Sequence, residues 1–141
     1  MAAVCYRIRN NNIEFLLVRT RAGRWTFPKG RIDDDPSPAH AAAREAYEEA
    51  GVHGRVYQEP FTSYLHAKCT TLFTGEHEVS AHLCHVFETS EAPESYRDPT
   101  WFSVEKSKRR LSEGRRRRHG RELERVVDTA VSLIANDNRL I

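Results

Sequence analysis

The alternation of hydrophobic and polar positions predicts a chain that begins with strands. Two apolar, β-prone segments, Ala2 to Arg9 and Ile13 to Thr20, flank three consecutive asparagines, which tolerate turn conformations. The pattern therefore predicts a β-hairpin. Residues 15–18 of the second segment are continuously apolar, which indicates a strand buried on both faces.

A helix is predicted from about Pro38 to Ala50. Ser37 is a residue type that caps helix N-termini, proline is favoured at the first helical position, and Gly51 suits the left-handed residue that closes a helix. The small side chains of this helix and one tyrosine are expected to pack against a sheet: Ala42, Ala43, Ala46, Tyr47 and Ala50.

Further strands are predicted after this helix, at Val52 to Tyr57, Phe61 to Thr71 and Val79 to Phe87. A break at Glu59–Pro60 separates the first two, and Thr74–Gly75 is interpreted as a turn before the third. Together with the hairpin, these strands are expected to form one mixed sheet.

The last third of the chain is predicted to be a loop followed by helices. Residues 89–99 contain prolines and acidic residues and are interpreted as a loop at the sheet edge. Ser103 is expected to begin a short helix. A final helix from about Glu122 to Ala135 has a broad apolar face, and we expect it to cover the sheet opposite the first helix.

Composition narrows the class of protein. A length of 141 residues fits one domain, spanning residues 1–141, with a real core. The N-terminal residues do not resemble a signal peptide and no stretch is long enough for a membrane helix, so we expect a soluble, cytoplasmic protein. The three cysteines, Cys5, Cys69 and Cys84, are expected to be reduced. The net charge of +2 does not by itself indicate nucleic-acid binding.

Three glutamates on the predicted helix are the first candidates for a functional site. Glu45, Glu48 and Glu49 are spaced i, i+3 and i+4, which brings them onto one helix face. Like charges at this spacing cost about 0.2–0.5 kcal/mol per pair, so an isolated cluster is locally unfavourable. A hard divalent cation such as Mg²⁺ would offset this repulsion, since it prefers carboxylate oxygens, water and phosphate. The alternative is an ordinary solvated face on which Arg44 pairs with Glu48.

The wider spacing resembles the Nudix box, in which a glycine, a loop and an Arg-Glu-rich helix recur at fixed intervals. The matching positions are Gly30, Arg44, Glu45, Ala46, Glu48, Glu49, Gly51 and Val52. One position departs from the family pattern, because Pro36 stands where the family has a glutamate that braces the box arginine. Asp33, Asp34 or Asp35 could reach that arginine instead.

The resemblance also implies roles for residues outside the helix. The motif Trp-x-x-Pro-Lys-Gly before the helix is similar to the one in Nudix enzymes that act on diadenosine or diphosphoinositol polyphosphates. This resemblance implies that Lys29 binds phosphate. Arg19 and Arg24 are further candidates for substrate binding. In related enzymes an acidic residue of the loop before a Trp-Phe pair assists the metal, which makes Asp98 a candidate alongside Glu91 and Glu94.

The resemblance implies the Nudix fold, an α/β/α sandwich with a mixed β-sheet between helices. It further implies hydrolysis of a diphosphate linkage in a nucleoside-diphosphate-X type of substrate, such as a dinucleoside polyphosphate or a diphosphoinositol polyphosphate. Arg44, Glu45, Glu48 and Glu49 would be the catalytic residues, and the three glutamates would bind Mg²⁺ or Mn²⁺. Either Glu48 or Glu49 is a candidate for the general base. Trp25, Tyr64 and Tyr96 are candidates for stacking on a base.

Two other functions remain open at this stage. Pro36 is compatible with a Nudix-fold binding module whose catalysis is impaired. The arginine run Arg115 to Arg118 suggests a nucleic-acid-interacting protein, although it lacks the interleaved aromatic residues of single-strand binding surfaces. We expect a small-molecule phosphate anhydride as the partner, with no membrane and no nucleic acid, and a homodimer stays open as the assembly.

Overall fold

The computed structural model describes residues 1–69 and 74–136, with the side chains of residues 68, 69 and 74 left out of the account. The predicted hairpin is confirmed: β1 (Ala2–Arg9) pairs antiparallel with β2 (Asn12–Arg19), around a turn in which Asn10 and Asn11 have positive φ. Residues 15–18 of β2 are buried, as predicted.

The strands form one seven-stranded mixed sheet. The long strand β6 (Thr74–Thr89) runs parallel to β1, and antiparallel to both β4 (Val52–Val56) and β5 (Thr62–Cys69). At the other side, β2 pairs antiparallel with β3 (Trp25–Thr26) and β7 (Thr100–Ser103). A short 3₁₀ helix, η1 (Ser95–Arg97), lies in the predicted acidic loop.

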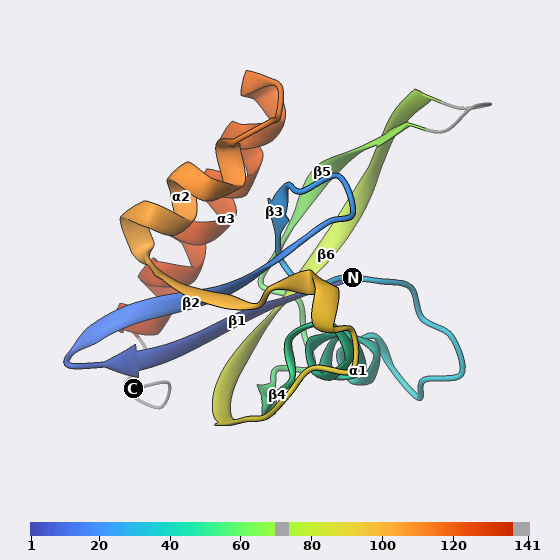
Figure 1. The fold of residues 1–141 in the computed structure, drawn as a ribbon. Helices are drawn as coiled ribbons and strands as arrows, with labels where there is room; N and C mark the ends of the chain where they lie inside the picture. Colours follow the sequence, from blue (N-terminus) through green and yellow to red (C-terminus); the bar gives the residue numbers. More distant parts are fainter. Residues whose placement is uncertain (70–73, 137–141) are drawn as a thin grey trace.

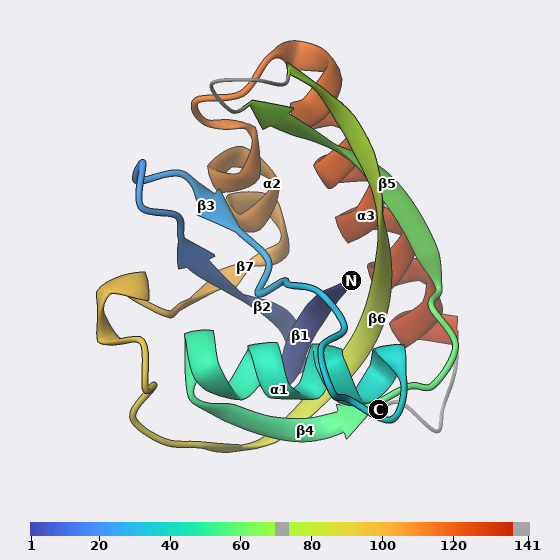
Figure 2. The same cartoon turned by 90° about the vertical axis from the view of Figure 1, so that its right-hand side faces the viewer.

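Helices cover both faces of this sheet, as Figures 1 and 2 show. The box helix α1 (Pro38–Ala50) lies on one face, whereas α2 (Val104–Ser112) and α3 (Arg117–Asn136) lie on the other. Successive side chains of a strand point to opposite faces. Residues 2, 4 and 6 of β1 therefore join the core with α3, and residues 3 and 5 join the core with α1. The predicted α/β/α sandwich is confirmed.

Two predicted boundaries are wrong. Thr74 and Gly75 are not a turn, because they are the first residues of β6 and pair with Cys69 and Lys68. The final helix begins at Arg117 rather than Glu122, so half of the arginine run is helical. Arginine is a good helix former, but a run without apolar periodicity gives no sign of it. The end of the predicted strand at Thr71 lies outside the described residues.

The box helix has the predicted ends. Ser37 accepts a hydrogen bond from the His40 N–H at 3.3 Å, and Gly51 closes the helix at φ 68°. Ala42, Ala46 and Ala50 are buried against the sheet, as predicted. Tyr47 is exposed and stacks on the ring of His53 instead of packing in the core, because the helix face it occupies turns away from the sheet.

The segment before the box is fixed to the start of β1. Backbone hydrogen bonds run from the Ala3 N–H to the Pro28 carbonyl at 2.9 Å and from the Gly30 N–H to the Met1 carbonyl at 3.0 Å. Lys29 thereby lies beside the sheet at its junction with the box loop. Within residues 1–69 and 74–136, no helix combines the length and apolar character that crossing a bilayer requires.

Candidate functional site

Arg44 is the centre of the polar network on α1. Its Nε donates to Asp35 Oδ1 at 3.0 Å and its Nη2 donates to Asp35 Oδ2 at 3.0 Å, a bidentate pair. Nη2 also donates to the Arg31 carbonyl at 3.0 Å. The hydrogen bonds from Arg44 lower the pKa of Asp35. The sequence leaves three aspartates as substitutes for the family glutamate that is missing at Pro36. Asp35 is the one that binds this arginine.

The same guanidinium also contacts two of the predicted glutamates. Nη1 of Arg44 donates to Glu45 Oε1 at 2.9 Å and to Glu48 Oε2 at 3.3 Å. The pairing of Arg44 with Glu48 that a solvated face would show is therefore present. Arg44 also binds Asp35 of the box loop, so one guanidinium connects that loop to Glu45 and Glu48 of the helix.

Glu49 is buried, with 3% of its surface exposed, and it lies against Glu45. Burial and, to a smaller extent, the hydrogen bond with Glu45 together raise the pKa of Glu49 to about 9, while Arg97 opposes the shift. Two adjacent carboxyl groups cannot both ionise without a cation nearby. A buried carboxylate pair of this kind is a donor set that suits a hard divalent cation.

Gly30 packs directly on this pair. A Cβ at position 30 would collide with the carboxylate of Glu45, so only glycine lets the loop lie this close. The close approach fixes Glu45 between the backbone of the loop and the guanidinium of Arg44. Gly30 is predicted to permit a close turn, and the space taken by the Glu45 carboxylate is the reason that a glycine is needed.

The three glutamates are not equivalent. Glu45 and Glu49 are adjacent, whereas the side chain of Glu48 is 41% exposed and bound to Arg44. In the part of the chain that the structure describes, no three Asp, Glu, His or Cys side chains are grouped closely enough to hold a metal ion. The residues that fit a cation best are therefore Glu45 and Glu49, while Glu48 shares the Nη1 of Arg44 with Glu45.

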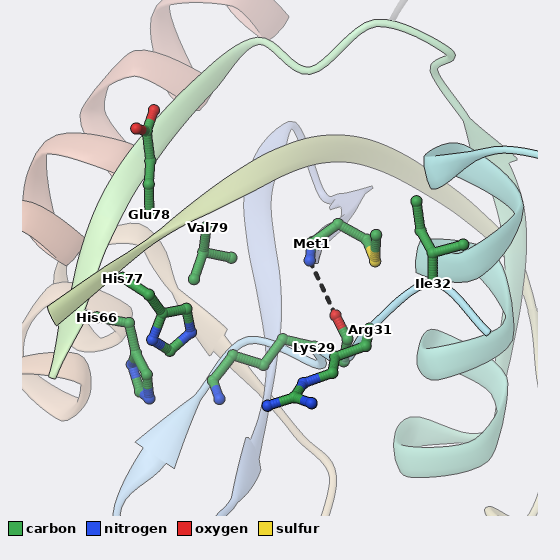
Figure 3. A pocket seen from close by; sticks show the side chains of 9 residues that line it. Met1, Lys29, Arg31, Ile32, His66, His77, Glu78 and Val79 are labelled. Atoms are coloured by element: carbon green, nitrogen blue, oxygen red, sulfur yellow. Dashed lines mark hydrogen bonds between the residues drawn. The ribbon is translucent and has the colours of Figure 1, made fainter. Parts of the chain in front are cut away.

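Lys29 lines a cavity of about 720 Å³ next to the box loop, together with Gly30, Arg31 and His66 (Figure 3). Burial lowers the pKa of Lys29, and the negative charge of Glu49 opposes this shift. The ammonium is therefore within electrostatic reach of the carboxylate pair, as the sequence predicted. Burial also lowers the pKa of His66 to about 4, so this side chain is neutral at pH 7.

Arg19 and Arg24 do not share one place. The guanidinium of Arg19 lies 4.1 Å from the centre of the Trp25 ring and pairs with Asp98 at 3.3 Å. Arg24 instead donates to the Gly114 carbonyl at 3.3 Å and lines a second cavity with Lys29. The structure therefore brings Arg24 together with Lys29, whereas Arg19 is paired with Asp98.

The acidic loop contributes an arginine that the sequence gave no reason to choose. Asp98 pairs with Arg19 rather than approaching Glu45 and Glu49. Arg97, by contrast, affects the pKa of both Glu49 and Lys29, and its buried Nε has no hydrogen-bond partner among the described residues. Only the fold of the loop around η1 shows this proximity, since no motif marks the position.

The three aromatic candidates for base stacking occupy different environments. Trp25 and Tyr64 are 6% and 2% exposed, so neither offers a free ring face. Tyr96 is 49% exposed and has the guanidinium groups of Arg21 and Arg97 at 5.6 and 4.9 Å from its ring centre. The exposed ring of Tyr96 is the one open to a planar ligand.

Comparisons with known proteins point to one family. A model of the NUDIX domain matches residues 1–123. The chain is 27% identical over 112 residues to diphosphoinositol polyphosphate phosphohydrolase 2 of Rattus norvegicus, covering 74% of this chain and 57% of that protein. It is 38% identical over 56 residues to the human 3-alpha form, covering 39% of this chain and 34% of that protein. The matches thus span 57% and 34% of the lengths of these two relatives.

Among solved structures, a C. elegans Ap4A hydrolase in a binary complex superposes with a TM-score of 0.70. The match covers 96% of this chain and 96% of that chain at 18% sequence identity. At that identity the likeness establishes the fold, and with it the mixed sheet between helices on both faces.

Proposed function

Because this chain belongs to the Nudix family, we propose that it hydrolyses a diphosphate linkage in a small-molecule substrate of the nucleoside-diphosphate-X type. The observation that carries this proposal is the pair formed by the buried Glu49 and the half-buried Glu45 beside Lys29, on a helix held to its loop by Arg44. The ammonium of Lys29 lies within electrostatic reach of both carboxylates. Dinucleoside polyphosphates and diphosphoinositol polyphosphates are the candidate substrates, since relatives and fold neighbours carry those names.

Glu45 and Glu49 would hold a divalent cation, Mg²⁺ or Mn²⁺, with Glu48 joining them from the adjacent turn. Such an ion, when bound, lowers the pKa of a water molecule and offsets phosphate charge. Arg44 positions Glu45 and Glu48 through its Nη1, and Lys29 supplies a positive charge for a phosphate. A carboxylate of the helix that stays off the ion is available as the base that accepts the proton of the attacking water.

The impaired-module alternative rests on Pro36, and the geometry around Arg44 argues against it. The carboxylate that the family supplies at that position has a substitute in Asp35, which makes a bidentate contact with the same guanidinium. The nucleic-acid alternative rests on the arginine run, which is divided between a loop and the first turn of α3. Neither alternative accounts for the buried carboxylate pair.

The test is metal-dependent turnover of a panel of phosphate anhydrides by the wild type and by Glu49→Gln. We expect the variant to lose at least about a hundredfold in kcat with little change in Tm, the size of a lost catalytic electrostatic contribution. Glu59→Gln is the matched control, because Glu59 is an exposed glutamate between β4 and β5. Equal turnover by wild type and Glu49→Gln would remove this residue from the mechanism.

A further inference from the structure

We propose that a second cavity, distinct from the one beside the box loop, binds the further phosphate groups of a multiply phosphorylated substrate. This cavity has a volume of about 550 Å³ and lies between the β5–β6 hairpin and the residues that join α2 to α3. Figure 2 shows the end of β5 and the start of β6 beside the start of α3. The inference builds on the proposed function, and Lys29 connects the two because it lines both cavities.

The charge of the lining is strongly one-sided. Five of its residues are cations of lysine or arginine: Arg24, Lys29, Arg115, Arg116 and Arg118. The acidic residue that lines it is Glu76, which is already paired with Arg118 at 3.0 Å and with His119 at 2.8 Å. The remaining positive charge attracts anions, and the low-dielectric walls of a cavity strengthen that attraction.

The cations are held in place without being neutralised. Arg115 Nη1 donates to the Leu111 carbonyl at 2.7 Å, and Arg24 Nη1 donates to the Gly114 carbonyl at 3.3 Å. Within the described residues, none of Arg24, Lys29 and Arg115 has a carboxylate partner at ion-pair distance. Neutral carbonyl groups orient a guanidinium but leave its charge in place, so an incoming anion finds oriented donors.

These cations also act on one another. Burial and the nearby charge of Arg24 together lower the pKa of Arg115 to about 10. Arg115 in turn lowers the pKa of Lys29. The cations therefore repel one another and the buried guanidinium is only partly solvated. A bound phosphate would remove both penalties.

An unpaired hydroxyl completes the site. Tyr64 is 2% exposed, its side chain lines the cavity, and its buried hydroxyl has no hydrogen-bond partner among the described residues. An unsatisfied buried group of this kind costs about 1–3 kcal/mol. A phosphate oxygen in the cavity would accept the hydrogen bond of this hydroxyl, whereas an apolar ligand would leave the cost in place.

The lining favours phosphate over a nucleobase. Tyr64 is the one six-membered aromatic side chain that lines the cavity, and the body of its ring is packed in the core, 6.2 Å from the ring of Phe27. The ring face of Tyr64 is therefore closed to stacking. Guanidinium groups and a hydroxyl are the donors that phosphate monoesters recognise. The substrate class is then a diphosphate whose other groups carry several phosphates.

The test separates this cavity from the box by omitting metal. Binding of myo-inositol hexakisphosphate, which has phosphate monoesters but no anhydride, is measured by calorimetry in EDTA. We expect Arg115→Gln to weaken binding by about tenfold or more, the effect of losing about 1.4 kcal/mol. Arg117→Gln, an exposed arginine of the same run outside this cavity, is the control and should change affinity less than about twofold.

Two further binding measurements test the roles of Tyr64 and of phosphate recognition. Tyr64→Phe should bind the hexakisphosphate more weakly while its unliganded Tm is unchanged or higher, since the unpaired hydroxyl is gone. ATP should bind no more tightly than inorganic tripolyphosphate, because the ring of Tyr64 is packed in the core and closed to adenine. Equal weakening by Arg115→Gln and Arg117→Gln, tighter binding of ATP than tripolyphosphate, or no binding by the wild type would each overturn the inference.

Failure of this inference and failure of the proposed function look different. If the hexakisphosphate binds through Arg115 but no anhydride is hydrolysed with metal, the cavity stands and the hydrolase proposal fails. If anhydrides are hydrolysed but Arg115→Gln leaves KM unchanged for every multiply phosphorylated substrate, the hydrolase proposal stands and the cavity has no part in recognition.

Discussion

At the scale of single residues, Arg44 shows how the chain compensates for a departure from its family pattern. Pro36 removes the carboxylate expected at that position, and Asp35 supplies one from the preceding residue, with two hydrogen bonds to the same guanidinium. The consequence is that Arg44 remains oriented toward Glu45 and Glu48. Partners of this kind set the orientation of groups that contact substrate or metal.

Asp35→Asn should therefore reduce catalysis without unfolding the protein. Asparagine retains the size of the side chain but cannot form the same charge-assisted bidentate contact, so Arg44 loses its fixed orientation. We expect kcat/KM to fall by about 10-fold to 100-fold, the usual effect of losing an outer partner at a metal site. Steady-state kinetics on the best anhydride substrate measures this. Asp34→Asn removes an exposed charge one residue away and should behave as wild type.

At the scale of elements, the closure of α1 decides where the acidic loop begins. Gly51 adopts φ 68°, its N–H donates to the Tyr47 carbonyl at 2.8 Å, and its carbonyl accepts from the Ser90 N–H at 2.7 Å. A single residue thus ends the box helix and also anchors the loop that contains η1. The position of Arg97 near Glu49 depends on this contact between the helix end and the loop.

Gly51→Ala should destabilise the fold through two separate effects. A left-handed backbone costs a residue with a Cβ about 1–2 kcal/mol, and here the Cβ would also collide with the Ser90 carbonyl. We expect the free energy of unfolding in urea to fall by about 2–4 kcal/mol. Gly23→Ala isolates the first effect, because Gly23 has φ 86° and open space around it. Equal losses in both variants would mean that the collision relaxes without cost.

At the scale of the whole molecule, the sheet separates two hydrophobic cores of different composition. The core with α2 and α3 contains the larger side chains, such as Tyr6 and Phe15, whereas the core under α1 is built from alanines and a few larger residues. The thin core lets the box helix lie close to the sheet, which buries Glu49 at its edge. Because Glu49 is buried, the protonation of its carboxyl group affects the free energy of unfolding of the whole protein.

This linkage predicts that the metal-free protein loses stability as pH rises from 7 to 9. The folded pKa of Glu49 is about 9 against an ordinary value of 4.5, so in this range the folded state retains a proton that the unfolded state has released. His66, whose folded pKa is about 4, is neutral in both states here and adds no slope.

The difference in unfolding free energy between wild type and Glu49→Gln should therefore fall by about 1 kcal/mol per pH unit. Denaturant unfolding in EDTA at pH 7, 8 and 9 measures it. Addition of Mg²⁺ should flatten the slope, because a carboxylate that binds the ion no longer needs the proton. A difference that is independent of pH would show that Glu49 is ionised throughout.

The sequence alone determined the local features of this protein. Periodicity, caps and asparagine turns predicted the hairpin and the box helix with its observed ends, because these depend on neighbours within a few residues. The same spacing brought Glu45 and Glu49 together and identified the family pattern. It also put Lys29 near the carboxylates, since a proline and a glycine fix the backbone on either side of it.

Only the tertiary structure decided which side chains meet across long stretches of sequence. It chose Asp35 among three aspartates, paired Arg19 with Asp98, and brought Arg115 and Tyr64 into one cavity. It also separated Glu48 from the buried pair, although all three glutamates share a helix face. The physical reason is that burial and charge pairing are properties of the packed molecule. A residue's spacing along the chain restricts its neighbours on one element but not the partners that folding brings to it from another.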